Sequence, residues 1–332
     1  MALKKRDFIF FFTICILLLG AVVLHLFSGQ LKLSWGEFFD SMFHFDVKNT
    51  QQLIAREFRI PRLVIAMVAG AALAVSGMLM QTLFNNPLAG PYVLGINSGS
   101  SLLVALSLLT GFSFFQSDIG LIASALFGAL IFGFLLLGLS MYIKSSISLL
   151  LIGLMLGSFT GAIITALQAV SSAQELKAFT IWTMGSLQQT QFNQLPVILL
   201  FFVIGISMCF FLVKPLDVLV IGEKNTEILG LNIKRIRVLT ITVTAILTGL
   251  TTAFCGPIAF VGMAVPNVTR ILLKTQSHRK LLLANLLFGA LFLVLADSSI
   301  QLLESTLPLP INAFTSLIGA PLIILIVLKR LK

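Results

Sequence analysis

The sequence predicts an all-α polytopic membrane protein with about ten transmembrane helices, built as a single membrane domain over residues 1–332. The first observation is composition: 58% of the residues are hydrophobic and 10% are charged, whereas soluble domains have about 45–50% and 25%. The second is that the apolar residues lie in long runs, several of which approach the roughly 20 residues that a helix needs to cross a bilayer. A water-soluble fold could not bury this apolar surplus.

The first expected span is Phe8–Phe27, which follows Lys4, Lys5 and Arg6. Such a start also suits a signal peptide, but this apolar run is longer than signal peptides carry and no clear small-residue cleavage site follows it, so we expect it to be retained. The next stretch, 31–45, mixes aromatic and acidic residues. It is too polar to span and suits a helix lying along the membrane surface.

Nine further apolar runs are separated by turns or by more polar segments. They predict spans over 60–82, 92–110, 118–141, 147–170, 195–213, 238–255, 258–274, 281–303 and 311–328. The prolines and glycine of 85–91 break the chain between two of these spans. The segment Ser171–Gln194 is expected to be a loop outside the bilayer, and the charged segment Lys214–Arg237 to form short helices outside it.

The net charge of +10 could suggest a nucleic-acid partner, but in a membrane protein basic residues first report topology through the positive-inside rule. Ten spans with a cytoplasmic N-terminus place both termini in the cytoplasm and 16 of the 22 Lys and Arg residues on that side. The other six are expected outside: Lys32, Lys48, Arg56, Arg59, Arg62 and Lys177. The sequence therefore predicts an inner-membrane protein embedded in the lipid bilayer, with no nucleic-acid partner.

Few residues could carry chemistry inside the membrane. Asp297 is the one acidic residue expected within a span, whereas ion-coupled carriers usually bury several coupling groups. The sequence has no phosphate-binding loop of the GxxxxGK[ST] type, so any ATP hydrolysis would belong to a separate subunit. The three cysteines and three histidines share no ligand spacing. We predict no catalytic residue, no metal site and no cofactor.

Three blocks of motifs occur in order along nearly the whole chain. They are Arg59-Ile60-Pro61-Arg62 with Gly70–Gly77, Gln81 and Asn85–Ala89; Gly222-Glu223 and Leu229–Leu231 with Gly256–Gly262, Pro266, Arg270, His278-Arg279 and Ala296-Asp297; and Leu309-Pro310-Ile311 with Ile318–Pro321. With these blocks the chain resembles the FecCD/BtuC-type permeases of bacterial ABC importers for iron-siderophores, haem and vitamin B12. The resemblance implies the BtuC-like type II importer fold, a second permease subunit, two cytoplasmic ATPases and an extracytoplasmic substrate-binding protein.

The resemblance also implies roles for particular residues. Arg59 and Arg62 lie three residues apart at an outer helix end, where they would form a cationic knob that engages acidic residues of the binding protein; without the resemblance, the same pair could simply snorkel to the interface. The third arginine of this pattern is Gln301 here. Further departures from the family pattern are Asn267, Pro308 and Asn312.

The segment of about 214–237 would be the coupling segment that presses on an ATPase, carried by Glu223, Leu229, Gly230 and Leu231; a solvated basic loop is the alternative. The transport pathway must be apolar or mildly polar, because few charged residues are available. Its candidate lining residues, each of which could equally pack against a neighbouring helix, are Met78, Gln81, Asn85, Asn97, Ser98 and Ser101.

The leading hypothesis is therefore a non-catalytic permease subunit that imports an iron-siderophore complex. Haem or vitamin B12 as cargo is the alternative within the same mechanism. The alternative of another class is an ion-coupled secondary transporter that uses Asp297. A membrane scaffold or sensor is a third hypothesis, and the lack of an appended soluble domain argues against it.

Overall fold

The computed structural model describes residues 5–28, 34–46, 48–92, 95–110, 117–143, 145–304 and 309–331, and every regular element in these ranges is a helix. Seven helical segments are long and apolar enough to cross a membrane, and three apolar helices are shorter. The seven are α1 (Lys5–Phe27), the run α3–η1–α4 (Thr50–Ile54, Ala55–Arg59, Ile60–Leu83), α6 (Asp118–Tyr142), α7 (Ser146–Val170), α9 (Leu195–Leu219), α11 (Ile233–Cys255) and α13 (His278–Leu303). The shorter three are α5 (Ile96–Leu109), α12 (Val261–Leu273) and the apolar part Ile311–Ile326 of α14 (Ile311–Leu331). The predicted all-helical class with about ten spans is confirmed.

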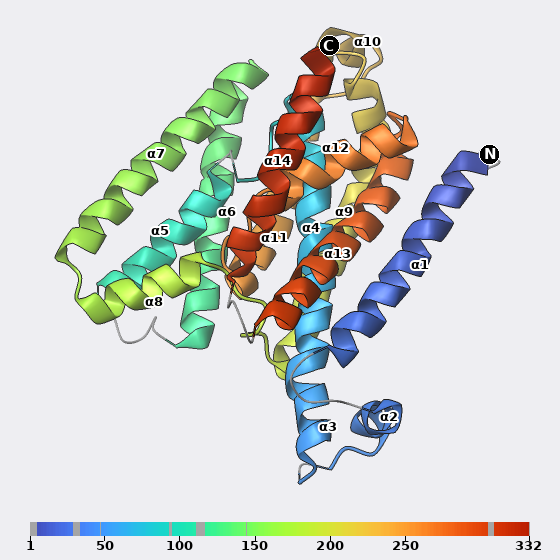
Figure 1. Cartoon of the computed structure of the whole chain (residues 1–332). Coiled ribbons are helices and arrows are strands. Elements are labelled where there is room, and N and C mark those ends of the chain that lie inside the picture. The colour runs from blue at the N-terminus through green and yellow to red at the C-terminus, as the bar shows by residue number, and fades with distance from the viewer. Residues whose placement is uncertain are drawn as a thin grey trace.

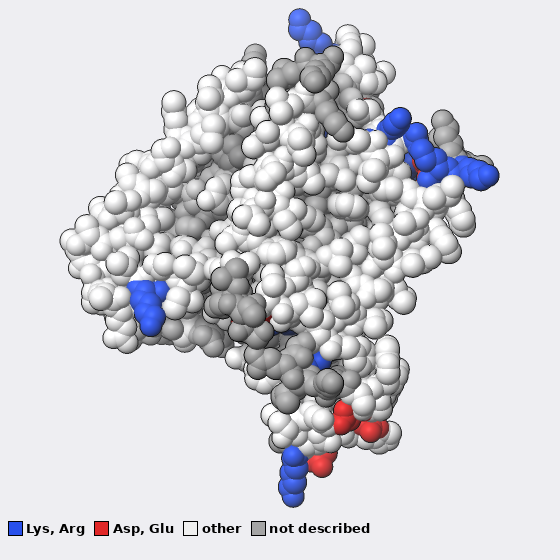
Figure 2. All heavy atoms as spheres, in the orientation of Figure 1, with Lys and Arg blue, Asp and Glu red and all other residues white. Residues whose placement is uncertain are grey.

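The long helices run roughly side by side, and the two ends of the chain lie at the same end of the bundle (Figure 1). We call this the inner end, and the opposite end, where α2 (Trp35–Phe43) and α8 (Ala173–Thr183) lie, the outer end. Figure 2 shows that the charged side chains of this face gather at the two ends and leave an uncharged belt between them. A lipid-facing surface requires such a belt, because charges are costly in the bilayer core.

Helix α4 is the centre of the bundle and contacts α9, α11, α12 and α13. Its most apolar stretch is 89% buried, against 17% for α7 at the periphery. Glycines allow this burial: a Cβ atom on Gly70 would overlap the backbone of Gly289 in α13, and one on Gly77 would overlap Gly262 in α12. Without a side chain between them the backbones come into direct contact, which is how helices associate in lipid.

The two short helices at the outer end, α2 and α8, begin at capping boxes formed by their N-terminal residues. The segment 171–194, expected to be a loop, contains α8, because Ser172 and Glu175 form a capping box. Ser34 and Glu37 form the same box at the start of α2. The loop prediction was therefore wrong for residues 173–183, which form a helix that packs across the outer end of the bundle with Phe179 and Trp182 buried (Figure 1).

The connection between α9 and α11 is shorter than the charged segment Lys214–Arg237 predicted from the sequence. Helix α9 continues through Pro215 to Leu219, and α11 already begins at Ile233. Several charged residues therefore sit on the inner ends of these long helices and not in the connection. The connection itself is 220–232 and holds one short helix, α10 (Glu223–Ile228).

Candidate functional site

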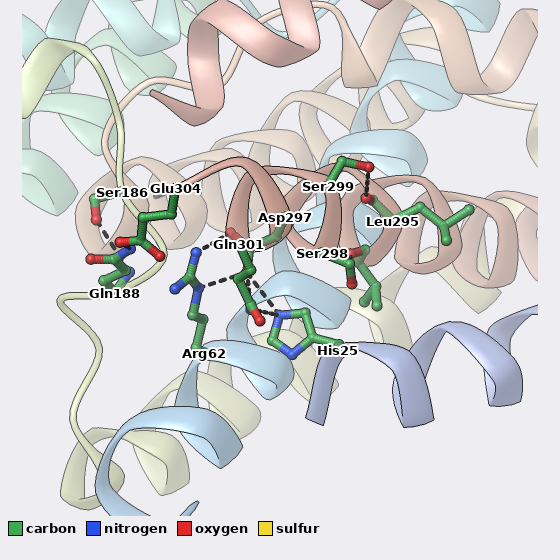
Figure 3. Close-up of polar contacts among 11 residues, drawn as sticks. His25, Arg62, Ser186, Gln188, Leu295, Asp297, Ser298, Ser299, Gln301 and Glu304 are labelled. Atoms are coloured by element: carbon green, nitrogen blue, oxygen red, sulfur yellow. Dashed lines mark hydrogen bonds and ion pairs between the residues drawn. The ribbon is translucent and has the colours of Figure 1, made fainter. Parts of the chain in front are cut away.

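A buried cluster of charged and polar side chains joins three helices near the outer end of the bundle (Figure 3). Asp297 of α13 lies at its centre, 2% exposed. Arg62, in the first turn of α4, donates from Nε to Asp297 Oδ2 at 2.7 Å and from Nη2 to Oδ1 at 2.9 Å. This two-pronged geometry is the strongest that an arginine and a carboxylate can form. The carboxylate is therefore already neutralised within the chain.

His25 and Gln301 complete the cluster, and both lie against the same carboxylate oxygen, Oδ2. His25, near the end of α1, lies with Nε2 2.7 Å from Asp297 Oδ2, and the amide nitrogen of Gln301 lies 2.9 Å from the same ring nitrogen. Gln301 also contacts Asp297 Oδ2, at 3.2 Å. An arginine at position 301 would bring a second full positive charge to this carboxylate. In this chain the neutral amide of Gln301 and the imidazole of His25 lie beside the carboxylate instead.

The two arginines expected to dock a binding protein do not form an exposed knob. Arg62 is only 14% exposed, because it faces α13. Arg59 is half-buried and donates from Nη1 to the carbonyl oxygen of Leu26 at 2.5 Å. Residues three apart share one face of a helix, and here that face turns toward α1 and α13. The sequence placed both side chains at the outer end, but their partners come from helices far away in the chain.

The predicted coupling residues lie together at the inner end, in and after α10 (Figure 1). Glu223 accepts a hydrogen bond from Arg237 Nη2 at 2.6 Å, and Arg237, itself buried, also donates to the carbonyl oxygen of Ile143 at 3.0 Å. The end of α10 is apolar and open: Ile228 is 81% exposed and Leu229 is 62% exposed. Gly230 follows with φ +78°, and Leu231 turns back toward the bundle.

Close to this segment, a chain of hydrogen bonds joins four helices. Asp217 in the last turn of α9 accepts from the backbone N–H of His278 at 2.6 Å and lies 2.8 Å from its Nδ1. The other ring nitrogen, Nε2, lies 2.8 Å from Thr82 Oγ1 in α4, and Arg270 of α12 donates to the same hydroxyl at 2.9 Å. We call these four residues the inner relay. His278 and Arg270 stood in the sequence motifs, but nothing in the sequence indicated their partners.

The pathway candidates fall into two groups. Gln81 and Asn85 line a cavity of about 290 Å³ beside the inner relay, whose walls also include Val220 and Arg270. Met78 and Asn97 are buried between helices, and Asn97 Oδ1 accepts from Thr252 at 2.9 Å. Ser98 and Ser101 are partly buried on α5. The structure thus brings two of the six candidates to an open space at the inner end.

Two departures from the expected motifs have structural roles. Asn312 Oδ1 accepts from the backbone N–H of Ala259 at 3.1 Å, which ties α14 to the turn before α12. Asn267 donates to the carbonyl oxygens of Pro87 and Met263, both at 2.8 Å. Pro308 lies outside the described residues. Among the described residues, no three His, Cys, Asp or Glu side chains are grouped as metal ligands.

Comparison with known proteins bears on the whole chain. The model of the FecCD transport family matches residues 16–329. The chain is 33% identical to the hemin transport permease HmuU of Yersinia pestis, over 91% of this chain and 90% of that one. It is 35% identical to the vitamin B12 import permease BtuC of Vibrio parahaemolyticus, over 94% and 93%.

A solved structure shows the same arrangement of helices. An ABC transporter of the metal-chelate type, in an inward-facing conformation, superposes with a TM-score of 0.85 and 30% identity, over 96% of this chain and 98% of that chain. The family match, the relatives and this superposition agree over the same residues. The chain belongs to the FecCD transport family and is a membrane-spanning permease of an ABC importer.

Proposed function

We propose that this permease imports an iron-siderophore complex and is driven by separate ATPase subunits that dock on α10. The open apolar end of α10 is the observation that supports this most directly. Ile228 and Leu229 are exposed at the end of α10, and the ion pair between Glu223 and Arg237 fixes the base of this helix to α11. A small apolar knob on a fixed base is suited to fill a groove on another protein.

Asp297 gives little support to the ion-coupled alternative. A coupling carboxylate must bind and release an ion in each cycle, whereas Arg62 holds both oxygens of Asp297. A structural role in joining α1, α4 and α13 accounts for its burial. The chain itself would then perform no covalent chemistry.

A second permease subunit would complete the transport pathway along α7. This helix is mostly open within the chain, and Ser158, Gly161 and Thr165 are exposed on it. Small and hydroxyl-bearing residues at this spacing suit close packing of helices or a mildly polar pathway. On the next side of α7, about a quarter turn around the helix, Met155 and Phe159 are large, apolar and exposed, as lipid contact requires.

Docking of an extracytoplasmic binding protein is proposed at the outer end, around Arg59, Arg62 and Gln301. Arg62 uses Nε and Nη2 for Asp297, and its guanidinium has further N–H groups. A carboxylate of the binding protein could share these, so that Asp297 and the partner hold the arginine together. Gln301 would offer an amide where the family pattern has a third positive charge.

The cargo proposal rests on the relatives together with the chemistry of the chain. HmuU and BtuC are named for hemin and vitamin B12, and the superposed transporter for a metal chelate. In each of these named cargoes a metal ion is bound by a large organic ligand. A permease that passes the intact chelate needs no metal ligands of its own.

The test is uptake by vesicles that contain this permease with its ATPase and binding protein. A ferric siderophore, hemin and cyanocobalamin are offered separately, with and without ATP. ATP-dependent uptake of the ferric siderophore alone supports the proposal, while uptake of only hemin or cyanocobalamin replaces the cargo and leaves the mechanism intact. Uptake driven by an ion gradient without the ATPase would overturn the importer mechanism.

Variants test the role of α10 in the same vesicles. Ile228→Asp with Leu229→Asp should abolish ATP-driven uptake, because charge on the knob prevents apolar docking, while the protein remains in the membrane. The matched control is Ile181→Asp, an exposed apolar residue of α8 at the outer end, which should leave the ATPase interaction unchanged. Full uptake by the α10 double variant would contradict the docking role.

A further inference from the structure

Helix α2 carries a largely exposed apolar face. Trp35, Phe39, Met42 and Phe43 are each more than half exposed, and their spacing of four, three and one residues places them on one side of a helix. On another side Phe38 packs against the bundle and Ser41 is buried. The nine residues of α2 include two acidic side chains and no basic one. The helix thus presents three distinct sides: protein-facing, apolar and acidic.

The position of α2 relates this face to the membrane. The ring of Trp35 lies 4.3 Å from that of Phe27, and the ring of Phe38 lies 6.2 Å from it. Phe27 is the last residue of α1, so α2 sits at the level where the first span ends. In Figure 1, α2 is seen nearly end-on, while α1 runs along the bundle, so the axis of α2 crosses the direction of the spans.

We propose that α2 lies in the outer leaflet, with Trp35, Phe39, Met42 and Phe43 inserted between the lipid headgroups and the upper part of the acyl chains. The same level of the bundle also carries exposed apolar residues at the end of α1, such as Leu24, and Trp35 of α2 reaches that end through Phe27. Tryptophan and other aromatic side chains favour this level of a bilayer.

The charges of α2 agree with a lipid partner of this kind. Glu37 and Asp40 lie on the side away from Trp35 and Met42 in the helical projection, so they reach water when the apolar face enters the leaflet. The helix has no Lys or Arg that could attract anionic lipids. Its attachment therefore depends on apolar insertion and does not require a negatively charged membrane.

Insertion of α2 would also fix the segment that follows it. Phe45, just beyond α2, stacks on the guanidinium of Arg56 at 4.3 Å, and Phe192 lies on that guanidinium at 4.9 Å. Arg56 belongs to η1, the outer part of a helical run of 34 residues. At 1.5 Å per residue this run is about 51 Å long, so its outer part extends beyond a bilayer core of about 30 Å. An anchored α2 steadies that projecting part at the membrane surface.

The two tryptophans of the chain allow a direct test. In Trp182→Phe, the tryptophan emission comes from Trp35 alone. In Trp35→Phe, it comes from Trp182 alone. Subtracting the emission of Trp35→Phe from that of the unaltered protein gives a second measure of the Trp35 signal. Each protein is placed in nanodiscs of phosphatidylcholine that is either unmodified or brominated near the headgroup. Aqueous iodide is the second quencher.

We expect headgroup-level bromine to reduce Trp35 emission by roughly half, as for a side chain 5–10 Å below the surface, and iodide to have little effect. Phe39→Glu with Phe43→Glu should remove the bromine quenching and expose Trp35 to iodide, while Asp40→Asn, on the acidic side, should change neither. Strong iodide quenching without bromine quenching would place the face in water. Protection from both quenchers would mean that protein covers it. Either result would overturn the proposal.

Discussion

At the scale of single residues, Asp297 has the largest predicted effect on stability. Asp297→Asn keeps the shape of the side chain but leaves Arg62 buried without its counter-ion, so we expect the free energy of unfolding to fall by about 3–5 kcal/mol. Urea or thermal unfolding in detergent measures this. Ser299→Ala, a partly exposed position two residues away, is the control and should stay within about 0.5 kcal/mol. An Asp297→Asn variant as stable as the parent would show that the cluster is not a structural lock.

Glu37 supplies a pH-dependent prediction at the same scale. The backbone N–H of Ser34, followed by its hydroxyl, donates to the carboxylate and holds the pKa of Glu37 below its ordinary value. A carboxylate whose pKa is lower in the folded state stabilises the fold at pH values above its unfolded pKa of about 4.3. This stabilisation is lost as the pH falls through the folded pKa. The start of α2 should therefore loosen only in acid.

The emission of Trp35 in Trp182→Phe, recorded against pH, measures this loosening, since Trp35 directly follows Ser34. Its acid midpoint should lie below the ordinary glutamate value. Glu37→Gln should lack this transition, because the capping group no longer titrates. A midpoint at or above the ordinary value in the parent chain would contradict the capping role.

At the scale of elements, the crossings of α4 with α12 and α13 depend on glycine. Gly77→Ala places a methyl group against the backbone of Gly262, and neither helix can yield without moving its other contacts. We expect a loss of about 3 kcal/mol or more in the free energy of unfolding, at or above the usual range for an overpacked core. Gly138→Ala in α6 is the matched control, because its added Cβ meets nothing within 4 Å. If Gly77→Ala were as stable as Gly138→Ala, the two helices would have room for a methyl group at this crossing, and the close backbone contact would be contradicted.

At the scale of the whole molecule, both termini are expected in the cytoplasm. In Cys15→Ala, which removes the one exposed cysteine among the described residues, a single Lys177→Cys on α8 should react with an impermeant maleimide on intact spheroplasts. Lys224→Cys on α10 should react only after permeabilisation. Both positions are exposed, so access to the reagent depends on the side of the membrane. The reverse pattern would invert the topology.

Much of the bundle could be predicted because bilayer thickness sets the length of every apolar run. The contacts of Asp297 could not, since its partners His25 and Arg62 lie 272 and 235 residues away in the sequence. The inner relay was missed for the same reason. Helix α8 differs, because its start is encoded locally by the capping-box spacing of Ser172 and Glu175, whereas the polarity of 171–194 alone indicates a loop.

The first helix is fastened to α13 at both of its ends. At the inner end, Lys280 donates to the buried Asp7 at 2.5 Å, and at the outer end His25 meets Asp297. The 26 residues of α13 measure about 39 Å, so the two helices form one strut across the membrane. A fluorescent reporter fused to the N-terminal end of α1 would therefore move together with α13. Its orientation would report the movement of α13 during the transport cycle without a label on α13 itself.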